Sequence, residues 1–193
     1  MSSLVGFLSL VFAIGINFYL LLSRYIFKFQ NQRFNLFIRL SSLLTLLSFF
    51  SLMYAYVTSD FSNYNVFQNS HSNKPLIYKI SGTWGNHEGS MLLWLCILSI
   101  YSFFFSFTKN IEENFQKLTL TIQAFLHTLF GLFIVFTSNP FLVNSILVDE
   151  GLGLNPILQD PGLAVHPPIL YACLLYTSPS PRDKCRSRMP SSA

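Results

Sequence analysis

Hydrophobic residues in this chain are gathered into long uncharged runs, and short polar segments separate them. The runs cover approximately residues 4–22, 40–57, 91–108 and 118–137. Each run is close to the roughly 20 residues that an α-helix needs to cross a bilayer. The pattern therefore predicts an all-α fold, a polytopic transmembrane helix bundle with four complete spans in the lipid bilayer.

A fifth apolar run begins near Gly162 and gives way to polar residues after Tyr176. It is too short to span a bilayer, so we expect a truncated fifth helix. The last residues, TSPSPRDKCRSRMPSSA, are rich in Ser, Pro and basic residues and cannot form a packed core. We interpret residues 1–172 as one membrane region and residues 173–193 as an unrelated tail, either artefactual or disordered. A disordered tail would be a genuine C-terminus of the protein, and this is the alternative to an artefact.

The composition agrees with a membrane protein. Hydrophobic residues make up 51% of the chain and charged residues 10%, whereas soluble domains carry about 25% charged residues. The net charge of +4 comes mainly from the tail, which argues against a nucleic-acid partner. The three cysteines form no CxxC or CxxCH motif, so the chain is not itself a c-type cytochrome.

The charges between the spans predict an orientation. The first loop carries several basic residues and no acid, and the fourth carries three acids and no base. Because basic loops stay on the side of synthesis, we expect the N-terminus and loops two and four to face outward. The 21 phenylalanines are typical of AT-rich organelle genes. We therefore expect the mitochondrial inner membrane, with the bacterial inner membrane as the alternative.

Loop two ends in the segment YKISGTWGNHEGSMLLW, residues 78–94. Asn86 or Ser90 is suited to cap the third span, and Glu88 lies near its positive end. Trp84 suits the membrane–water boundary. His87 is then held at the rim of a helix, either as a site residue or as an ordinary interfacial histidine in a capping turn.

Loop four ends in GLGLNPILQDPGLAVHPPILY, residues 151–171. His166 precedes two prolines, which favour an extended residue before them and suit a first helical turn. We therefore place His166 at the start of the fifth helix. A rigidly held imidazole at a membrane surface suits a haem or metal ligand, and an ordinary helix-entry histidine is the alternative. Asp160 is a turn residue or a partner that orients the imidazole.

His127 lies inside the fourth span, where an ionisable side chain is costly. We expect a neutral imidazole that is hydrogen-bonded to Thr119, Thr121 or Ser99.

Three segments together carry a family resemblance: TWGNHEGSMLLW, TSNPF and LNPILQDPGLAVHPPILY. They closely resemble consecutive segments of the CcmF family of cytochrome c-type biogenesis proteins, including its mitochondrial form. Their order and spacing match as well, and the resemblance covers about residues 1–172. It implies a haem lyase that joins haem to the CxxCH thiols of apocytochrome c. It also implies two partners, a CcmE-like haem chaperone and a CcmH-like thiol-handling subunit.

The resemblance also implies site residues. By match, His166 is an axial ligand to the haem iron on the outer face, and Trp84 and His87 belong to the same haem-binding region. No residue is expected to act as a catalytic group, because thioether formation is largely the cofactor's own chemistry. The family's tryptophan-rich WWD segment and its second outer histidine are missing, so we expect this chain alone to be inactive. The alternatives are a non-catalytic subunit of a split lyase and a haem transporter subunit.

Overall fold

The computed structural model describes residues 1–25, 33–109, 111–144, 148, 150–153 and 160–176. The described part is helical: α1 (Ser2–Tyr25), α2 (Phe34–Val57), α3 (Tyr64–Asn69), α4 (Leu76–Gly82), α5 (His87–Phe105), α6 (Glu113–Thr137) and α7 (Pro161–Tyr176). Four of these helices, α1, α2, α5 and α6, are long and apolar enough to cross a membrane. The predicted bundle of four spans is confirmed, as a multi-pass membrane protein.

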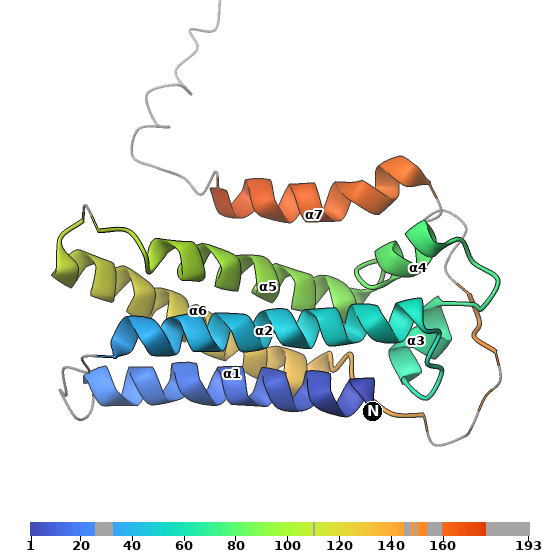
Figure 1. Cartoon of the computed structure of the whole chain (residues 1–193), viewed down its shortest axis with the longest axis horizontal. Coiled ribbons are helices and arrows are strands. Elements are labelled where there is room, and N and C mark those ends of the chain that lie inside the picture. Colours follow the sequence, from blue (N-terminus) through green and yellow to red (C-terminus); the bar gives the residue numbers. More distant parts are fainter. Residues whose placement is uncertain (26–32, 110, 145–147, 149, 154–159, 177–193) are drawn as a thin grey trace, which may run out of the picture.

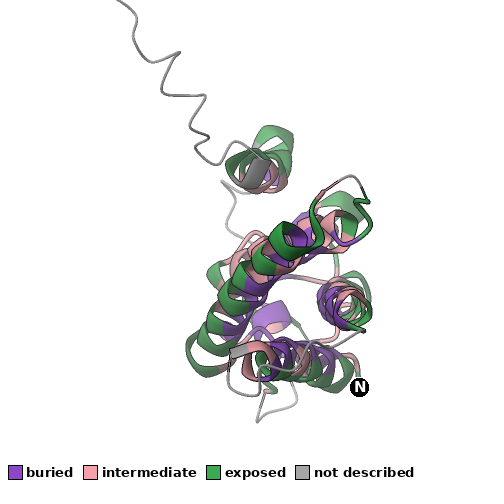
Figure 2. Ribbon diagram, turned by 90° about the vertical axis from the view of Figure 1, so that its left-hand side faces the viewer, coloured by how far each residue is buried: buried purple, intermediate pink, exposed green. Residues whose placement is uncertain are grey.

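The four long helices lie side by side and form a closed bundle (Figure 1). Helix α1 packs against α2 and α6, and α5 completes the bundle by packing against α2 and α6. Figure 2 shows that buried residues face the inside of the bundle and exposed residues face outward. Many outward residues are large and apolar, such as Phe12 and Phe136, which is the pattern of helices that face lipid.

Small residues allow the helices to approach each other closely. Ala13 and Ala124 are buried between helices, and a Cβ on Gly131 would lie 2.5 Å from a side-chain carbon of Ile14. Small residues are common at helix interfaces in membranes, because no hydrophobic effect drives helices together within lipid. Close packing is therefore an important source of stability for this bundle.

One end of the bundle carries most of the non-spanning structure, and we call it the loop end. It includes the N-terminus, α3, α4 and the start of α7 (Figure 1). Loops two and four are joined there: Tyr64 N donates to Leu142 O at 2.8 Å, and Asn144 N donates to Ser62 O at 2.8 Å. The two loops lie at the same end of the bundle, because two spans separate them. Their outward orientation stays a prediction, and α3 and α4 were not predicted.

Helix α2 ends at the loop end in a Schellman motif. Ser59 has a positive φ of 53°, and Asp60 N donates to Ala55 O at 2.9 Å while Ser59 N donates to Tyr56 O at 3.2 Å. This pair of bonds satisfies carbonyls that the end of a helix leaves free. The motif turns the chain sharply toward α3.

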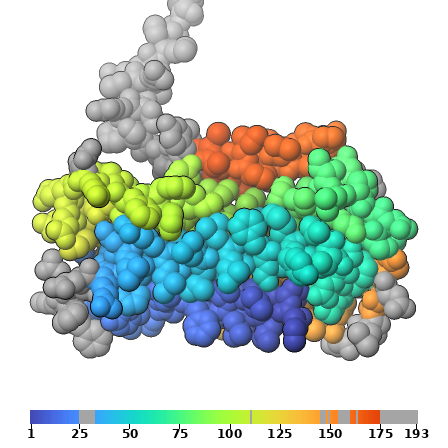
Figure 3. Space-filling view, viewed as in Figure 1, coloured from blue at the N-terminus to red at the C-terminus, as the bar shows by residue number. Residues whose placement is uncertain are grey.

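Helix α7 lies along the outside of the bundle, against α5 and α4 (Figure 3). It has 16 residues and continues through Tyr176, past the boundary predicted at residue 172. The tail predicted for the end of the chain lies outside the described residues from position 177 onward. Helix α7 is therefore an attachment to the four-helix bundle and not one of its core members.

Candidate functional site

The turn between α4 and α5 is fixed by the cap of α5. Asn86 is the N-cap residue, and its Oδ1 accepts a hydrogen bond from Gly89 N at 2.8 Å. The predicted cap is thus confirmed at Asn86. Gly89 is required here, because a Cβ at this position would lie 1.7 Å from the carbonyl oxygen of Thr83.

A partly buried hydrogen-bond network attaches this turn to the bundle. The Asn86 amide donates to Tyr56 Oη and to Gly82 O, both at 2.9 Å. Asn65 Nδ2 donates to Asn86 Oδ1 at 3.0 Å and to Glu88 Oε2 at 3.3 Å. A connected network of paired polar groups makes a local structure rigid, so the turn that carries Trp84 and His87 is held firmly.

The start of α7 is held by Asp160. Its Oδ1 accepts from Gly162 N at 2.7 Å, and its carbonyl accepts from Ala164 N at 2.9 Å. Asp160 therefore acts as a helix cap. Because α7 begins at Pro161, His166 lies in the second turn and not at the start of the helix, which corrects the sequence-based placement. Pro167 and Pro168 lie inside the helix.

Trp84 joins the turn to α7 through a carbonyl that a proline has freed. In an α-helix, the carbonyl of Ala164 normally accepts from the backbone N–H of residue 168. That residue is Pro168, which has no N–H, so the carbonyl is left without a backbone donor. The indole Nε1 of Trp84 donates to Ala164 O at 2.8 Å instead. This contact was not predicted, although the HPP segment itself indicates a free carbonyl four residues before its second proline.

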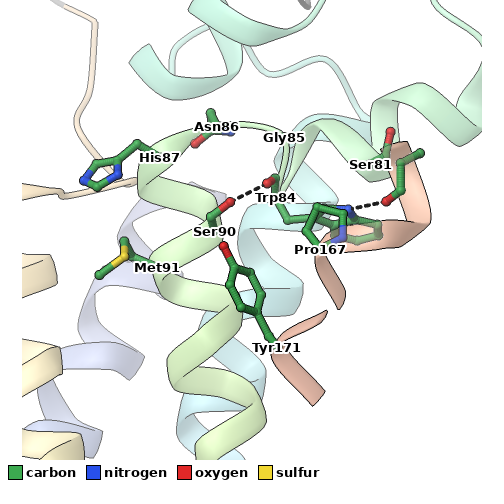
Figure 4. Close-up of a pocket in the computed structure, with 10 residues that line it drawn as sticks. Ser81, Trp84, Gly85, Asn86, His87, Ser90, Met91, Pro167 and Tyr171 are labelled. Carbon is green, nitrogen blue, oxygen red and sulfur yellow. Dashed lines mark hydrogen bonds between the residues drawn. The ribbon is translucent and has the colours of Figure 1, made fainter. Parts of the chain in front are cut away.

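A cavity of about 360 Å³ lies between α4, the turn, the start of α5 and α7 (Figure 4). Its wall is mostly apolar on the α7 side, with a few polar groups at the rim, as in many small-molecule sites. Ser81 Oγ is a buried rim atom with no hydrogen-bond partner among the described groups. The lining residues are Ser81, Trp84, Gly85, Asn86, His87, Ser90, Met91, Ala164, Pro167 and Tyr171.

His87 lines the cavity but its ring is directed away from Trp84 and Pro167 (Figure 4). Its Nε2 lies 3.1 Å from Ser138 Oγ, in the segment that follows α6. The side chain is otherwise exposed. The structure therefore places two of the three predicted site residues, Trp84 and His87, around one cavity.

His166 lies on a different face of α7. Ala164, Pro167 and Tyr171 line the cavity, with the three- and four-residue spacing of one helical face. His166 is two residues from Ala164, which rotates it by about 200° at 3.6 residues per turn. Its side chain is exposed and does not line the cavity. The structure therefore does not bring His87 and His166 to one side of α7.

Titratable groups in the loops tie the loop end together. Burial alone would raise the pKa of Asp60, but hydrogen bonds from Ser62 and Ser2 lower it below its usual value. A hydrogen bond from Ser72 lowers the pKa of Glu150, with a smaller contribution from His71. Burial lowers the pKa of Lys74 to about 8.

Within the described part of the chain, no group of three or more His, Cys, Asp or Glu could hold a metal ion.

His127 lies far from the loops, in the centre of the bundle. Its Nδ1 is 3.1 Å from Asn17 Nδ2, and its Nε2 is 2.9 Å from Thr45 Oγ1. These partners come from α1 and α2, so the expected partners Thr119, Thr121 and Ser99 are wrong. The hydroxyls of Thr119 and Thr121 donate to carbonyls of their own helix and not to the imidazole.

The donors around His127 determine its tautomer. Thr45 donates its proton to Ser41 O at 3.0 Å, so Thr45 Oγ1 accepts from the imidazole at Nε2. Asn17 Nδ2 carries two protons, which go to Ala13 O and to His127 Nδ1. A neutral imidazole with its proton on Nε2 completes these hydrogen bonds. We call the set formed by Asn17, Thr45 and His127 the His127 relay. His127 therefore has a structural role in holding α1, α2 and α6 together.

The fold and the loop-end cavity define a polytopic helical membrane protein, and comparisons with known proteins identify its class. Residues 84–178 match the family model described as Cytochrome C assembly protein. The chain belongs to the CcmF family of cytochrome c-type biogenesis proteins.

Two relatives illustrate this membership. The chain is 55% identical over 130 residues to cytochrome c-type biogenesis protein CycK of Rhizobium meliloti, which covers 67% of this chain and 19% of that protein. It is 43% identical over 128 residues to CcmF of Escherichia coli, which covers 64% of this chain and 20% of that protein. The chain thus spans about a fifth of the length of these relatives.

A solved structure supports the same fold. The protein named Cytochrome c Heme Lyase CcmF superposes with a TM-score of 0.72 over 89% of this chain and 28% of that chain. The identity is 23%, so this likeness bears on the arrangement of the helices alone.

Proposed function

We propose that this chain forms part of a cytochrome c maturation haem lyase and that His166 is an axial ligand to haem iron at the outer membrane face. Membership of the CcmF family carries the proposal, because the relatives are named as cytochrome c-type biogenesis proteins. The substrate would be apocytochrome c, and the partners would be a CcmE-like haem chaperone and a CcmH-like thiol-handling subunit. The membrane would be the mitochondrial or bacterial inner membrane.

The exposed face of α7 fits one side of a haem. His166 is exposed, and Ile169 and Leu170 follow it at positions i+3 and i+4 with exposed fractions of 58% and 47%. An imidazole beside an apolar surface suits a flat, largely apolar macrocycle with a central iron. His166 would hold the iron, and the apolar side chains beside it would contact the macrocycle.

The fixed backbone of α7 supports this role. Asp160 caps its start, Trp84 bonds to Ala164 O at 2.8 Å, and Tyr101 Oη donates to Ala172 O at 3.2 Å. The Trp84 contact holds the start of α7 against the turn between α4 and α5, and the Tyr101 contact holds its later part against α5. His166 would therefore be presented in one position and would not have to be ordered when the ligand binds.

When bound, haem would supply the vinyl carbons that react with the two cysteine thiols. The residues of this chain would bind and orient the macrocycle at the membrane surface. Holding two reactants in the correct geometry contributes several kcal/mol to a reaction. Trp84 and His87 would act in this proposal through the position of α7 and the turn, and not as direct partners of His166.

The proposal is tested in a full-length setting. The matched 130-residue region of Rhizobium meliloti CycK is replaced by the corresponding region of this chain. Production of c-type cytochromes is then measured by haem staining in a strain that lacks its own CycK. We expect the chimera to support production and its His166→Ala variant to lose it at least tenfold.

His71→Ala is the matched control, since His71 also lies at the loop end but pairs with Glu150 at 3.6 Å. It should retain production. Full activity of the His166→Ala chimera would contradict the ligand assignment. The same result would favour a non-catalytic supporting subunit.

A further inference from the structure

A second, much smaller cavity lies between the four spanning helices, next to the His127 relay. Its volume is about 10 Å³. Most of its lining side chains are polar, although they lie in the middle of membrane-spanning helices. The lining residues are Asn17, Ile38, Ser41, Ser42, Ser99, Ser102, Gln123, Ala124 and His127.

Ser99 contributes an unpaired polar atom to this cavity. The residue is 1% exposed, and its Oγ has no hydrogen-bond partner among the described protein groups. A buried hydroxyl without a partner costs free energy, and in lipid no bulk solvent is available to pair with it. Ser99 therefore indicates a ligand that can accept or donate a hydrogen bond.

The neighbouring hydroxyls define the chemistry of that ligand. Ser42 donates to Ile38 O at 2.9 Å, and Ser102 donates to Gln123 Oε1 at 2.9 Å. Their protons are used, but their oxygen atoms can still accept hydrogen bonds. Ser99 can both donate and accept. The lining contains no carboxylate, lysine or arginine, and both ring nitrogens of its one histidine, His127, already have partners. A small neutral donor–acceptor therefore fits the cavity and an ion does not.

We infer that this cavity is a binding site for one water molecule, held by Ser99 together with the oxygen atoms of Ser42 and Ser102. A cavity of about 10–15 Å³ is the smallest that holds a water, and the water needs two to four polar partners. Apolar cavities of larger size remain dry, so the polar lining decides the occupant.

The water has a structural consequence for the loop end. The His127 relay joins α1, α2 and α6 but does not include α5. Ser99 and Ser102 belong to α5, and Ser42 belongs to α2. A water at this position connects α5 to α2 beside the relay. It therefore helps to fix the helix whose first turn carries His87.

The direct test is a high-resolution structure of the full chain in lipid nanodiscs. We expect an ordered solvent peak about 3 Å from Ser99 Oγ and within the same distance of Ser42 or Ser102. Absence of this peak, in a map that shows other buried waters, would overturn the inference.

A pair of variants gives an independent test by thermal unfolding. Ser99→Ala removes the donor to the water, so the midpoint should fall by about 2–4 °C. Ser48→Ala is the control, because Ser48 Oγ is also buried and unpaired but lines no part of this cavity. Its midpoint should stay the same or rise. A rise for Ser99→Ala equal to that of Ser48→Ala would show a dry cavity and overturn the inference.

Discussion

His166 at the loop end and His127 in the interior of the bundle have opposite surroundings. His127 is 5% exposed, and both of its ring nitrogens are hydrogen-bonded to other helices. His166 is exposed, and it forms no hydrogen bond with any described residue. An imidazole whose nitrogens are already paired holds helices together, whereas an available imidazole on a fixed helix can bind a ligand.

The same contrast extends to the surrounding polar groups. At the loop end, Asn86 and Tyr56 fix the backbone that presents Trp84 and His87. In the interior, Asn17 and Thr45 fix the helices relative to one another. One network positions a surface, and the other sets the packing of the spans. Substitutions in the two networks should therefore affect different properties.

The largest expected effect comes from the α5 cap. Gly89→Ala should destabilise the protein by about 3 kcal/mol, because the new Cβ meets the Thr83 carbonyl and the backbone has to move. Gly15→Ala is the control, since nothing lies within 4 Å of its Cβ. It should stabilise α1 by up to about 1 kcal/mol. Denaturant unfolding in mild detergent measures both, and equal effects of the two variants would contradict the close approach.

His127→Leu should lower the free energy of unfolding by about 2 kcal/mol, because Asn17 loses the acceptor for its second amide proton. Thr128→Val is the matched control on the same helix. Its hydroxyl bonds only to Ala124 O at 2.8 Å, so this variant should be nearly neutral. Haem-dependent properties should not change in either variant. Unaltered stability of His127→Leu would argue against the relay.

Trp84→Phe should cost about 1 kcal/mol locally, since it leaves the Ala164 carbonyl without a donor. The effect should appear as faster amide hydrogen exchange in α7, with little change in α1 or α2. Trp94→Phe serves as the control, because Trp94 contacts Phe130 through its ring, with centroids 4.0 Å apart. Equal exchange in α7 for the two variants would mean that the indole hydrogen bond does not hold this helix.

The smallest expected effect is the change in stability at acidic pH that depends on Asp60. The pKa of Asp60 is lowered in the folded state, so its carboxylate stabilises the protein above the ordinary value of 3.8. This contribution is lost as the pH falls through the lowered pKa. It should amount to a few tenths of a kcal/mol, since solvent screens the exposed side. Asp60→Asn should therefore reduce stability slightly at pH 7 and flatten its decline below pH 4, as measured by thermal unfolding across that range.

The sequence predicted the parts of this molecule that depend on local composition. The four spans follow from uncharged apolar runs, and the Asn86 cap follows from its position before α5. Helices α3 and α4 were missed, because six and seven residues with mixed polarity give no clear period. The partners of His127 were also missed, since periodicity shows which residues are buried but not which helix they face.

The geometry around α7 depended on tertiary contacts in the same way. The two prolines suggested that His166 begins the helix, but Asp160 caps it five residues earlier at Pro161. Within that helix, His166 lies on a different face from the residues that line the cavity next to His87. The sequence identified both histidines as candidates but could not show that they face different spaces.

The central claim is that the exposed histidine of α7, and not the histidine of the cavity, binds haem. The direct measurement is the visible absorption spectrum of the purified CycK chimera. It is recorded for the unmutated chimera and for its His166→Ala and His87→Ala variants. We predict that His166→Ala shifts or removes the Soret band, while His87→Ala keeps the spectrum of the unmutated chimera. A Soret band that is unchanged in His166→Ala and lost in His87→Ala would contradict the account.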